Sequence, residues 1–293
     1  MVTRHILSVD VERWSDATLL AGWVDRRAGQ PLVQAQTEQV LSILAHTGVQ
    51  ATFFVVGEVA KDNPGLIRDI VARGHEIGCH GWTHDLLVDL GQERLMADLG
   101  RARGLLQDLS GQPVTAFRAP TWSLDRKVPW APEVIRKTGF RVDMSIFDGR
   151  HGIYGEPVAA GRPLRIATDA GDLFELPTAV RSWSGLRAGG GFYWRSLPRR
   201  WIAASYAAKS YPAVGYLHPW EVGRPTWQFP DAVPASVRFS MTAGADAFAE
   251  KLVWLLSAIL WGPACKVATD QAAQLAPRMV LGSGGLRPIG EAE

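Results

Sequence analysis

Two pairs of side chains in this sequence have the types and spacing of metal ligands. His80 and His84 are four residues apart, and Asp10 and Glu12 close an apolar segment near the N-terminus. Imidazole and carboxylate groups are the usual ligands of a catalytic zinc ion, and three protein ligands leave one coordination position open for water or substrate. These residues therefore predict one divalent metal ion, with zinc as the first choice, and hydrolytic chemistry.

The spacing within each pair allows both members to face one cavity. On an extended segment, residues two apart point to the same side, so Asp10 and Glu12 can face inward while Val11 packs the other way. His80 and His84 share a face if the residues between them form a helical turn. The alternatives are an acidic cap on a following helix for the carboxylates and a structural role for each histidine.

The elements that must position these residues alternate between strand-length apolar runs and helix-length periodic segments. Gly189, Gly190 and Gly191 mark a loop or a close backbone approach. Repeated strand–helix units predict a parallel sheet with helices outside it, in one continuous barrel. Strands are expected at 5–10, 51–56, 75–79, 115–118, 141–146, 173–176 and 214–218, and helices at 36–46, 64–74, 92–109 and 197–209.

Five polar residues fall at or just past the carboxyl ends of these expected strands. They are Asp10, Glu12, His80, Arg118 and His218. Parallel barrels and open parallel sheets collect their catalytic groups at that edge. The sequence therefore predicts one active site there.

The composition is that of an ordinary globular chain. Its 293 residues are 47% hydrophobic and 20% charged, with a formal net charge of +2 and no clustered basic run. We therefore expect no nucleic-acid partner, because binding nucleic acid needs a concentrated basic patch. The two cysteines, Cys79 and Cys265, give no disulfide framework and are compatible with a reducing compartment.

Two short apolar segments bear on location. Segment 6–9 is too short for a signal peptide and ends in acidic residues, so we expect a cytoplasmic protein, acting in the cytoplasm or at the inner membrane surface. The run from Leu252 to Trp261 is about half the length that crosses a bilayer. We expect a helix docked on the core there, with peripheral membrane contact as the alternative.

Six segments, occurring in order over about residues 4 to 225, carry a family resemblance. The chain resembles the polysaccharide deacetylase family, carbohydrate esterase family 4, and within it the exopolysaccharide-locus branch with an Asp-Val-Glu first motif. The segments are Ser8-Val9-Asp10-Val11-Glu12, Ala51-Thr52-Phe53-Phe54-Val55, Gly74-His75-Glu76-Ile77-Gly78, His80-Gly81-Trp82-Thr83-His84, Phe117-Arg118-Ala119-Pro120 and Tyr216-Leu217-His218-Pro219-Trp220-Glu221.

This resemblance implies an α/β fold, a distorted (β/α) barrel of about seven parallel strands. We expect a single domain over residues 1–281, including the docked C-terminal helix, and a flexible tail over 282–293. The implied activity is metal-dependent removal of acetyl groups from N-acetylhexosamine units of an exopolysaccharide or its lipid-linked precursor.

The first motif departs from the pattern of most of the family, in which two adjacent aspartates serve as base and metal ligand. Asp10 matches the base, but Val11 stands at the ligand position. Glu12 can replace that ligand because it lies on the same side as Asp10. The implied metal ligands are thus Glu12, His80 and His84. Arg13 stands where this branch commonly has a further aspartate, which changes the local charge.

The resemblance also implies roles for other residues. Arg118 matches an arginine that pairs with the base, the backbone N–H of Thr121 would stabilise an oxyanion, and His218 would protonate the leaving amine. A structural ion pair is the alternative for Arg118. The remaining candidates are three tryptophans for stacking on sugar, with a core position as the alternative, and two carboxylates that could tune a catalytic neighbour: Trp82, Trp122, Trp220, Asp143 and Glu221.

Two other functions are compatible with the same residues. A small-molecule amide or cyclic-imide hydrolase could use this barrel, because fold alone does not fix function. A non-catalytic sugar-binding protein is conceivable because of Val11. An open groove would favour the polysaccharide, and a closed pocket the small molecule. No bound metal, with no loss on Asp10→Asn, would favour the non-catalytic protein.

Overall fold

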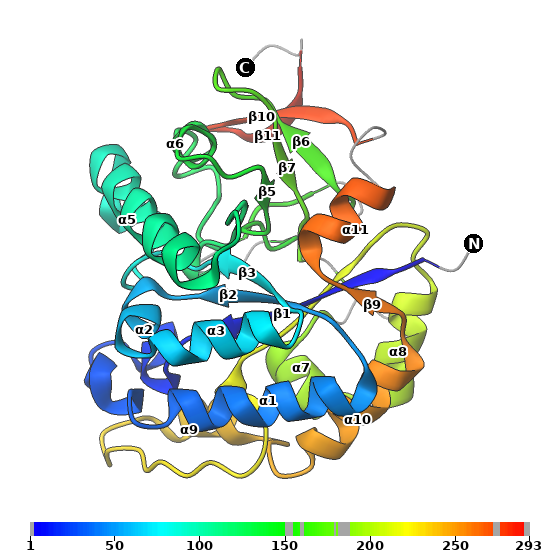
Figure 1. The fold of residues 1–293 in the computed structure, drawn as a ribbon. Coiled ribbons are helices and arrows are strands. Elements are labelled where there is room, and N and C mark those ends of the chain that lie inside the picture. The colour runs from blue at the N-terminus through cyan, green and yellow to red at the C-terminus, as the bar shows by residue number, and fades with distance from the viewer. Residues whose placement is uncertain are drawn as a thin grey trace.

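The computed structural model describes residues 3–149, 155–158, 161–178, 180, 188–271 and 276–289. A mostly parallel sheet forms its centre (Figure 1). The parallel strands follow the order β7-β5-β4-β3-β2-β1-β8, and a further short strand, β9 (Trp261–Gly262), also pairs parallel with β1, close to the predicted number of about seven. Their bounds are β1 (His5–Val11), β2 (Thr52–Val55), β3 (Glu76–Cys79), β4 (Ala116–Phe117), β5 (Val142–Asp143), β7 (Leu173–Glu175) and β8 (Val214–Leu217).

The ladder is not continuous between β7 and β8 in the described part of the chain. Instead, Ala188 N–H donates to the Val180 carbonyl (2.7 Å), and Tyr216 N–H donates to the Gly189 carbonyl (3.0 Å). A Cβ on Gly190 would lie 2.0 Å from the Tyr216 carbonyl oxygen, so only glycine fits at this seam. The close backbone approach predicted for the glycine run is confirmed, and among the described residues the sheet is not closed by a continuous ladder at this point.

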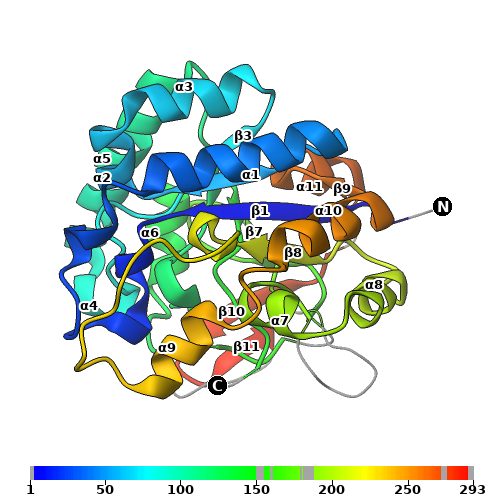
Figure 2. The ribbon, with the colours of Figure 1, turned by 90° about the horizontal axis from the view of Figure 1, so that it is seen from below.

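The two faces of the sheet bury different apolar clusters. On β1, Val9 and Val11 join the cluster that includes Val40 of helix α1, while Ile6 belongs to a second cluster with Phe54. This alternation follows from the two-residue period of a strand. Figure 2 shows α1 running beside β1. The helices are α1 (Val33–Thr47), α2 (Gly57–Asp62), α3 (Pro64–Ala72), α4 (Leu87–Leu90), α5 (Gln92–Ser110), α6 (Ala131–Lys137), α7 (Gly191–Ser196), α8 (Arg199–Ala207), α9 (Ala235–Thr242), α10 (Phe248–Ala258) and α11 (Ala264–Gln271).

A helix docked on the core is expected from Leu252 to Trp261, and α10 covers that range only as far as Ala258. It buries Phe248, Leu252, Leu255 and Leu256 and packs against α1 and α8. Among the described residues, no helix combines the length and the hydropathy that a membrane span requires.

The C-terminal segment differs from the expected loose tail. Strand β11 (Gly285–Pro288) pairs antiparallel with β10 (Arg278–Gly282), which in turn pairs with β6 (Leu164–Ile166). Gly282 faces Gly285 across a two-residue turn, so the polar, glycine-rich sequence is a tight hairpin here. One further short strand, β9 (Trp261–Gly262), pairs with β1. Residues 290–293 lie outside the described residues.

Candidate active site

The carboxyl ends of β1, β3, β4 and β8 surround a cavity of about 340 Å³. It is lined by all five of the polar residues predicted at strand ends, together with Thr121, Trp122, Trp220 and Glu221. Side chains that the sequence did not single out complete the wall, among them Thr18, Phe192, Arg195 and Met241. The predicted convergence at this edge of the sheet is therefore confirmed.

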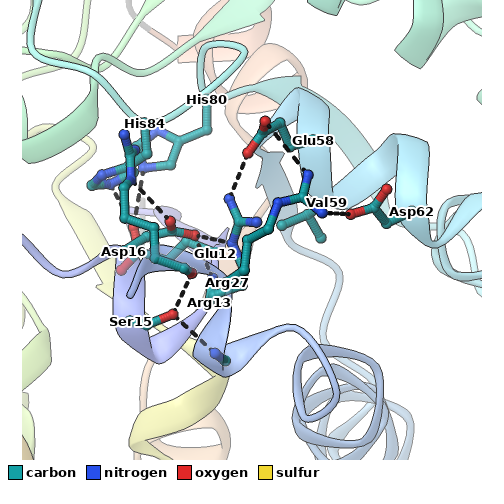
Figure 3. Close-up of polar contacts among 12 residues, drawn as sticks. Glu12, Arg13, Ser15, Asp16, Arg27, Glu58, Val59, Asp62, His80 and His84 are labelled. Carbon is teal, nitrogen blue, oxygen red and sulfur yellow. Dashed lines mark hydrogen bonds and ion pairs between the residues drawn. The ribbon is translucent and has the colours of Figure 1, made fainter. Parts of the chain in front are cut away.

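Glu12 bridges the two histidines of the predicted ligand set. Its Oε2 lies 2.6 Å from His84 Nε2 and 3.7 Å from His80 Nε2, and all three side chains are buried (Figure 3). Residues 81–83 form a bend rather than the expected helical turn. Gly81 (75°) and His84 (62°) have positive φ angles, and the ring centroids of His80 and His84 lie 5.1 Å apart.

The donor set fits a divalent metal ion. Each of Glu12, His80 and His84 offers one ligand atom, and these atoms lie within 4.8 Å of one another. His80 Nδ1–H donates to the Arg118 carbonyl (2.8 Å), which leaves Nε2 able to bind a metal ion, as in many histidine-ligated metal sites. Burial disfavours ionised Glu12, but the adjacent His84 and His218 more than offset this and hold the pKa of Glu12 well below its usual value. A carboxylate and two imidazoles are typical ligands of zinc.

The departure at Arg13 has a direct structural consequence. Its side chain points away from the ligand set, with Nε 2.8 Å from Asp16 Oδ2 and Nη2 2.9 Å from Glu58 Oε2 (Figure 3). Asp16 Oδ1 lies 3.5 Å from Arg26 as well. The added positive charge is thus paired with carboxylates of neighbouring elements and is not directed at the metal ligands.

Asp10, on the same strand as Glu12, forms a buried ion pair with Arg118. Its Oδ1 lies 2.6 Å from Arg118 Nη1, and Arg118 Nε donates to the Met144 carbonyl (3.2 Å). The guanidinium also lies over the Phe54 ring at 4.6 Å. A Cβ on Gly78 would come within 2.5 Å of that ring, so the glycine makes room for this arrangement. This charge-assisted hydrogen bond fixes the orientation of the Asp10 carboxyl group.

His218 faces both acidic residues of the first motif. Its Nε2 lies 3.7 Å from Glu12 Oε1 and 3.9 Å from Asp10 Oδ2, and its ring stacks on Trp220 at 4.8 Å. Nδ1–H donates to Glu221 Oε2 (3.0 Å), so Glu221 directly contacts the proposed acid. Burial opposes protonation, but Glu12 and Glu221 outweigh it and raise the pKa of His218 to about 9.

The segment that carries Thr121 has an unusual backbone. Thr121 (φ 55°) and Trp122 (φ 49°) both adopt left-handed angles within a short 3-10 helix, Pro120–Trp122. Such angles are uncommon for non-glycine residues and cluster at functional sites. The first N–H groups of a helix have no acceptor inside it, so Thr121 N–H suits the predicted oxyanion role. The Thr121 hydroxyl lies 2.5 Å from that of Thr18.

Asp143 is linked through Ser145 to Ala119, next to the Pro120–Trp122 segment, and among the described residues it makes no hydrogen bond or ion pair with His218. It accepts a hydrogen bond from the Ser145 hydroxyl (2.5 Å), which in turn accepts from Ala119 N–H (2.8 Å). Burial raises the pKa of Asp143 to about 6. Burial and the charge of Asp143 together raise the pKa of neighbouring Glu175 well above its usual value. Both carboxyl groups therefore bind a proton more tightly than they would in water.

The three candidate tryptophans have different surroundings. Trp82 does not line this cavity: its ring packs against Gly57 and lies 3.5 Å from the Arg101 guanidinium. Trp82 thus stands outside this cavity, and its contact with sugar stays a prediction. Trp122 does line the cavity, and its indole N–H donates to the Thr178 hydroxyl (3.1 Å). Trp220 also lines it and donates to Glu12 Oε1 (3.2 Å), so it positions a metal ligand.

Two known sequence families each match a different range of this chain. Residues 25–142 match the polysaccharide deacetylase family, and residues 144–269 match a domain of unknown function (DUF3473). A chitooligosaccharide deacetylase of Sinorhizobium fredii is 48% identical over 69 residues, which are 22% of this chain and 32% of that protein. This chain thus spans about a third of the length of that relative.

Solved structures related to polysaccharide deacetylases share the fold over most of the chain. A Mycobacterium smegmatis protein named after this family has a TM-score of 0.64 and 20% identity, covering 100% of this chain and 95% of its own. A family 4 carbohydrate esterase pseudoenzyme from Bacillus anthracis has a TM-score of 0.50 and 16% identity, covering 91% of this chain and 65% of its own. Both comparisons show the fold alone.

The two matched ranges contribute different sides of the cavity. The polysaccharide deacetylase range holds His80, His84, Arg118 and the Thr121 segment, whereas the second range holds Arg195, His218, Trp220 and Glu221. Asp10 and Glu12 on β1 precede both ranges. Sequence reasoning missed Arg195, whose only signal was its position shortly after the glycine run.

Proposed function

We propose that this protein is a metal-dependent N-deacetylase that removes acetyl groups from N-acetylhexosamine units. The observation that carries the proposal is the single cavity shared by a buried Asp10–Arg118 ion pair, the Glu12, His80 and His84 donor set, and His218. Base, metal ligands and acid are thus within reach of one substrate group. The family match of residues 25–142 supports the same activity.

An amide carbonyl is a poor electrophile, so its hydrolysis needs help at three points. A divalent ion held by Glu12, His80 and His84 would supply Lewis-acid polarisation of the acetyl oxygen and a lower pKa for a bound water. Asp10, held in place by Arg118, accepts a proton as water attacks the carbonyl carbon. The backbone N–H of Thr121 donates to the developing oxyanion.

Departure of the amine completes the reaction. The C–N bond breaks, its electron pair goes to nitrogen, and His218 delivers a proton from Nε2 to that nitrogen. Its Nδ1–H remains bonded to Glu221, which keeps Nε2 directed into the cavity. The products are acetate and the free amino sugar.

The cavity size bears on the substrate. At about 340 Å³ it lies near the lower end of the range for ligand sites, about 300–1,000 Å³, so it suits one sugar ring with its acetamido group. The finer parts of the proposal are an exopolysaccharide or its lipid-linked precursor as substrate, zinc as the metal, and action in the cytoplasm or at the inner membrane surface.

Acetate release from N-acetylglucosamine oligomers tests this function. Metal-replete protein is expected to release acetate, and His80→Ala and Asp10→Asn are expected to abolish it. The matched control is His46→Ala, because His46 is exposed on α1 and distant in sequence from every site residue. Release that survives both site substitutions would eliminate the mechanism.

The size of the cavity also favours a second candidate, a small-molecule amide or cyclic-imide hydrolase. Assays with N-acetylglucosamine, its oligomers and a simple cyclic imide separate the two. Preference for the imide would replace the deacetylase proposal. A protein that binds no metal and turns over none of these substrates would instead be a sugar-binding protein, a function compatible with the fold shared with the pseudoenzyme.

A further inference from the structure

The buried side chain of Arg195 joins two parts of the cavity wall. On helix α7, its Nε donates to Glu221 Oε1 (3.0 Å). Its other two nitrogens donate to backbone carbonyls at the end of α9, with Nη1 2.5 Å from Ala243 O and Nη2 2.8 Å from Ser240 O. Arg195 is 4% exposed. All three guanidinium nitrogens are therefore committed within the protein.

Glu221 is held at both of its oxygens. Oε1 accepts from Arg195, while Oε2 accepts from the backbone N–H (2.9 Å) and from Nδ1–H (3.0 Å) of His218. The carboxylate can rotate only by breaking one of these bonds. Because Glu221 determines which ring nitrogen of His218 carries the hydrogen-bonded proton, the orientation of the acid depends on Arg195 through Glu221.

We propose that Arg195 is a positioning residue for proton delivery by His218, and that this is one contribution of the second sequence range to the reaction. The proposal rests on the proposed deacetylase function. Lysine cannot replace arginine here, because a single ammonium lacks the planar fork that reaches one carboxylate and two carbonyls at once. The bond to the Ser240 carbonyl also fixes Ser240, which lines the cavity. Arg195 therefore holds His218 and the Ser240 side of the cavity in fixed positions relative to each other.

A purely structural role for Arg195 would affect all substrates equally, so the test compares two leaving groups. In the acetamido sugar, the C–N bond breaks, nitrogen takes the electron pair and a proton is required. In 4-nitrophenyl acetate, the C–O bond breaks and the phenolate leaves with the electron pair, without needing a proton. Attack on the carbonyl is common to both reactions.

The experiment measures kcat/KM of metal-replete protein for an N-acetylglucosamine oligomer and for 4-nitrophenyl acetate. Arg195→Lys is expected to lower the value for the oligomer about 10- to 100-fold, and that for the ester less than about 3-fold. Glu221→Gln should show the same selectivity, and this variant decides the matter if Arg195→Lys does not fold. The matched control is Arg200→Lys, because Arg200 is exposed on α8.

The outcomes separate the two proposals. Equal losses on both substrates in a folded, metal-containing variant would overturn the role of Arg195 and leave the deacetylase activity standing. Wild-type protein that cleaves the ester but releases no acetate from the oligomer would overturn the proposed function and, with it, the role of Arg195. Selective loss on the oligomer in both variants supports the positioning role.

Discussion

The two sides of the cavity hold their charged groups in different ways. On the side of β1, β3 and β4, Asp10 pairs directly with Arg118, and Glu12 lies directly between two histidines. On the side of β8, His218 depends on Glu221, which depends on Arg195 and on backbone carbonyls of α9. The first side uses direct pairs, whereas the second uses a chain of contacts.

This difference has a chemical counterpart. The direct pairs act on water and on the carbonyl group, which every acyl substrate shares. The linked contacts of His218, Glu221 and Arg195 act on the leaving group, which differs between substrates. Damage to the first side should therefore abolish hydrolysis in general, and damage to the second should affect only substrates with poor leaving groups.

The largest effect is expected from His80→Ala. Loss of one of three protein ligands should remove the metal and lower kcat/KM at least about a thousand-fold for both the oligomer and the ester, because metal polarisation contributes several kcal/mol. Elemental analysis measures the metal and acetate release the activity. If His80→Ala kept its activity on either the oligomer or the ester, the first side would not be required for hydrolysis in general, and the distinction between the two sides would be wrong.

Asp10→Asn and Glu12→Gln divide the first side into base and ligand. We expect Asp10→Asn to keep the metal and to lose about 100- to 10,000-fold in activity on both substrates. Glu12→Gln should weaken metal affinity more than Asp10→Asn, because its Oε2 contacts both histidines. Chelator competition measures the affinities, and equal affinities would refute this assignment of roles.

His218→Ala sharpens the comparison on the second side. Loss of the acid should lower acetate release from the oligomer about 100-fold or more and leave hydrolysis of 4-nitrophenyl acetate within about 3-fold of wild type. Parallel kinetic measurements on the two substrates check this. An equal loss on the ester would place His218 in the attack step instead.

The smallest effect concerns the buried pair behind the first side, Asp143 and Glu175. Both pKa values are raised in the folded protein, that of Asp143 to about 6. The contribution of these two carboxyl groups to the free energy of unfolding is therefore fully present below pH about 4. It is lost as the pH rises through their pKa values in the folded protein. Glu175→Gln should make this decline shallower by roughly 1 kcal/mol between pH 5 and 8.

Urea unfolding at several pH values in that window measures this change, with Glu93→Gln on the exposed start of α5 as the control. A wild-type stability that rises across the window relative to the variant would contradict the raised pKa values.

On the first side the sequence predicted Asp10, Glu12, His80, His84 and Arg118, and on the second it predicted His218 and Glu221 but not Arg195. Residues at strand ends, such as Asp10 and His80, follow apolar runs that indicate strands, so their convergence could be inferred from the topology of a parallel sheet. Arg195 lies in a six-residue helix with no such signal, and its partners are backbone carbonyls, which no residue type reveals. The two-residue β9 and the β10–β11 hairpin were missed because short pairings depend on contacts distant in sequence.

Strand β1 has a consequence for biosynthesis. It lies between β2 and β8, and Ile6 pairs with Val214, 208 positions later. A ribosome therefore finishes the strand bearing Asp10 long before its second neighbour exists, and one ladder edge stays unpaired throughout that interval. Such late closure slows folding and exposes a nascent chain to aggregation.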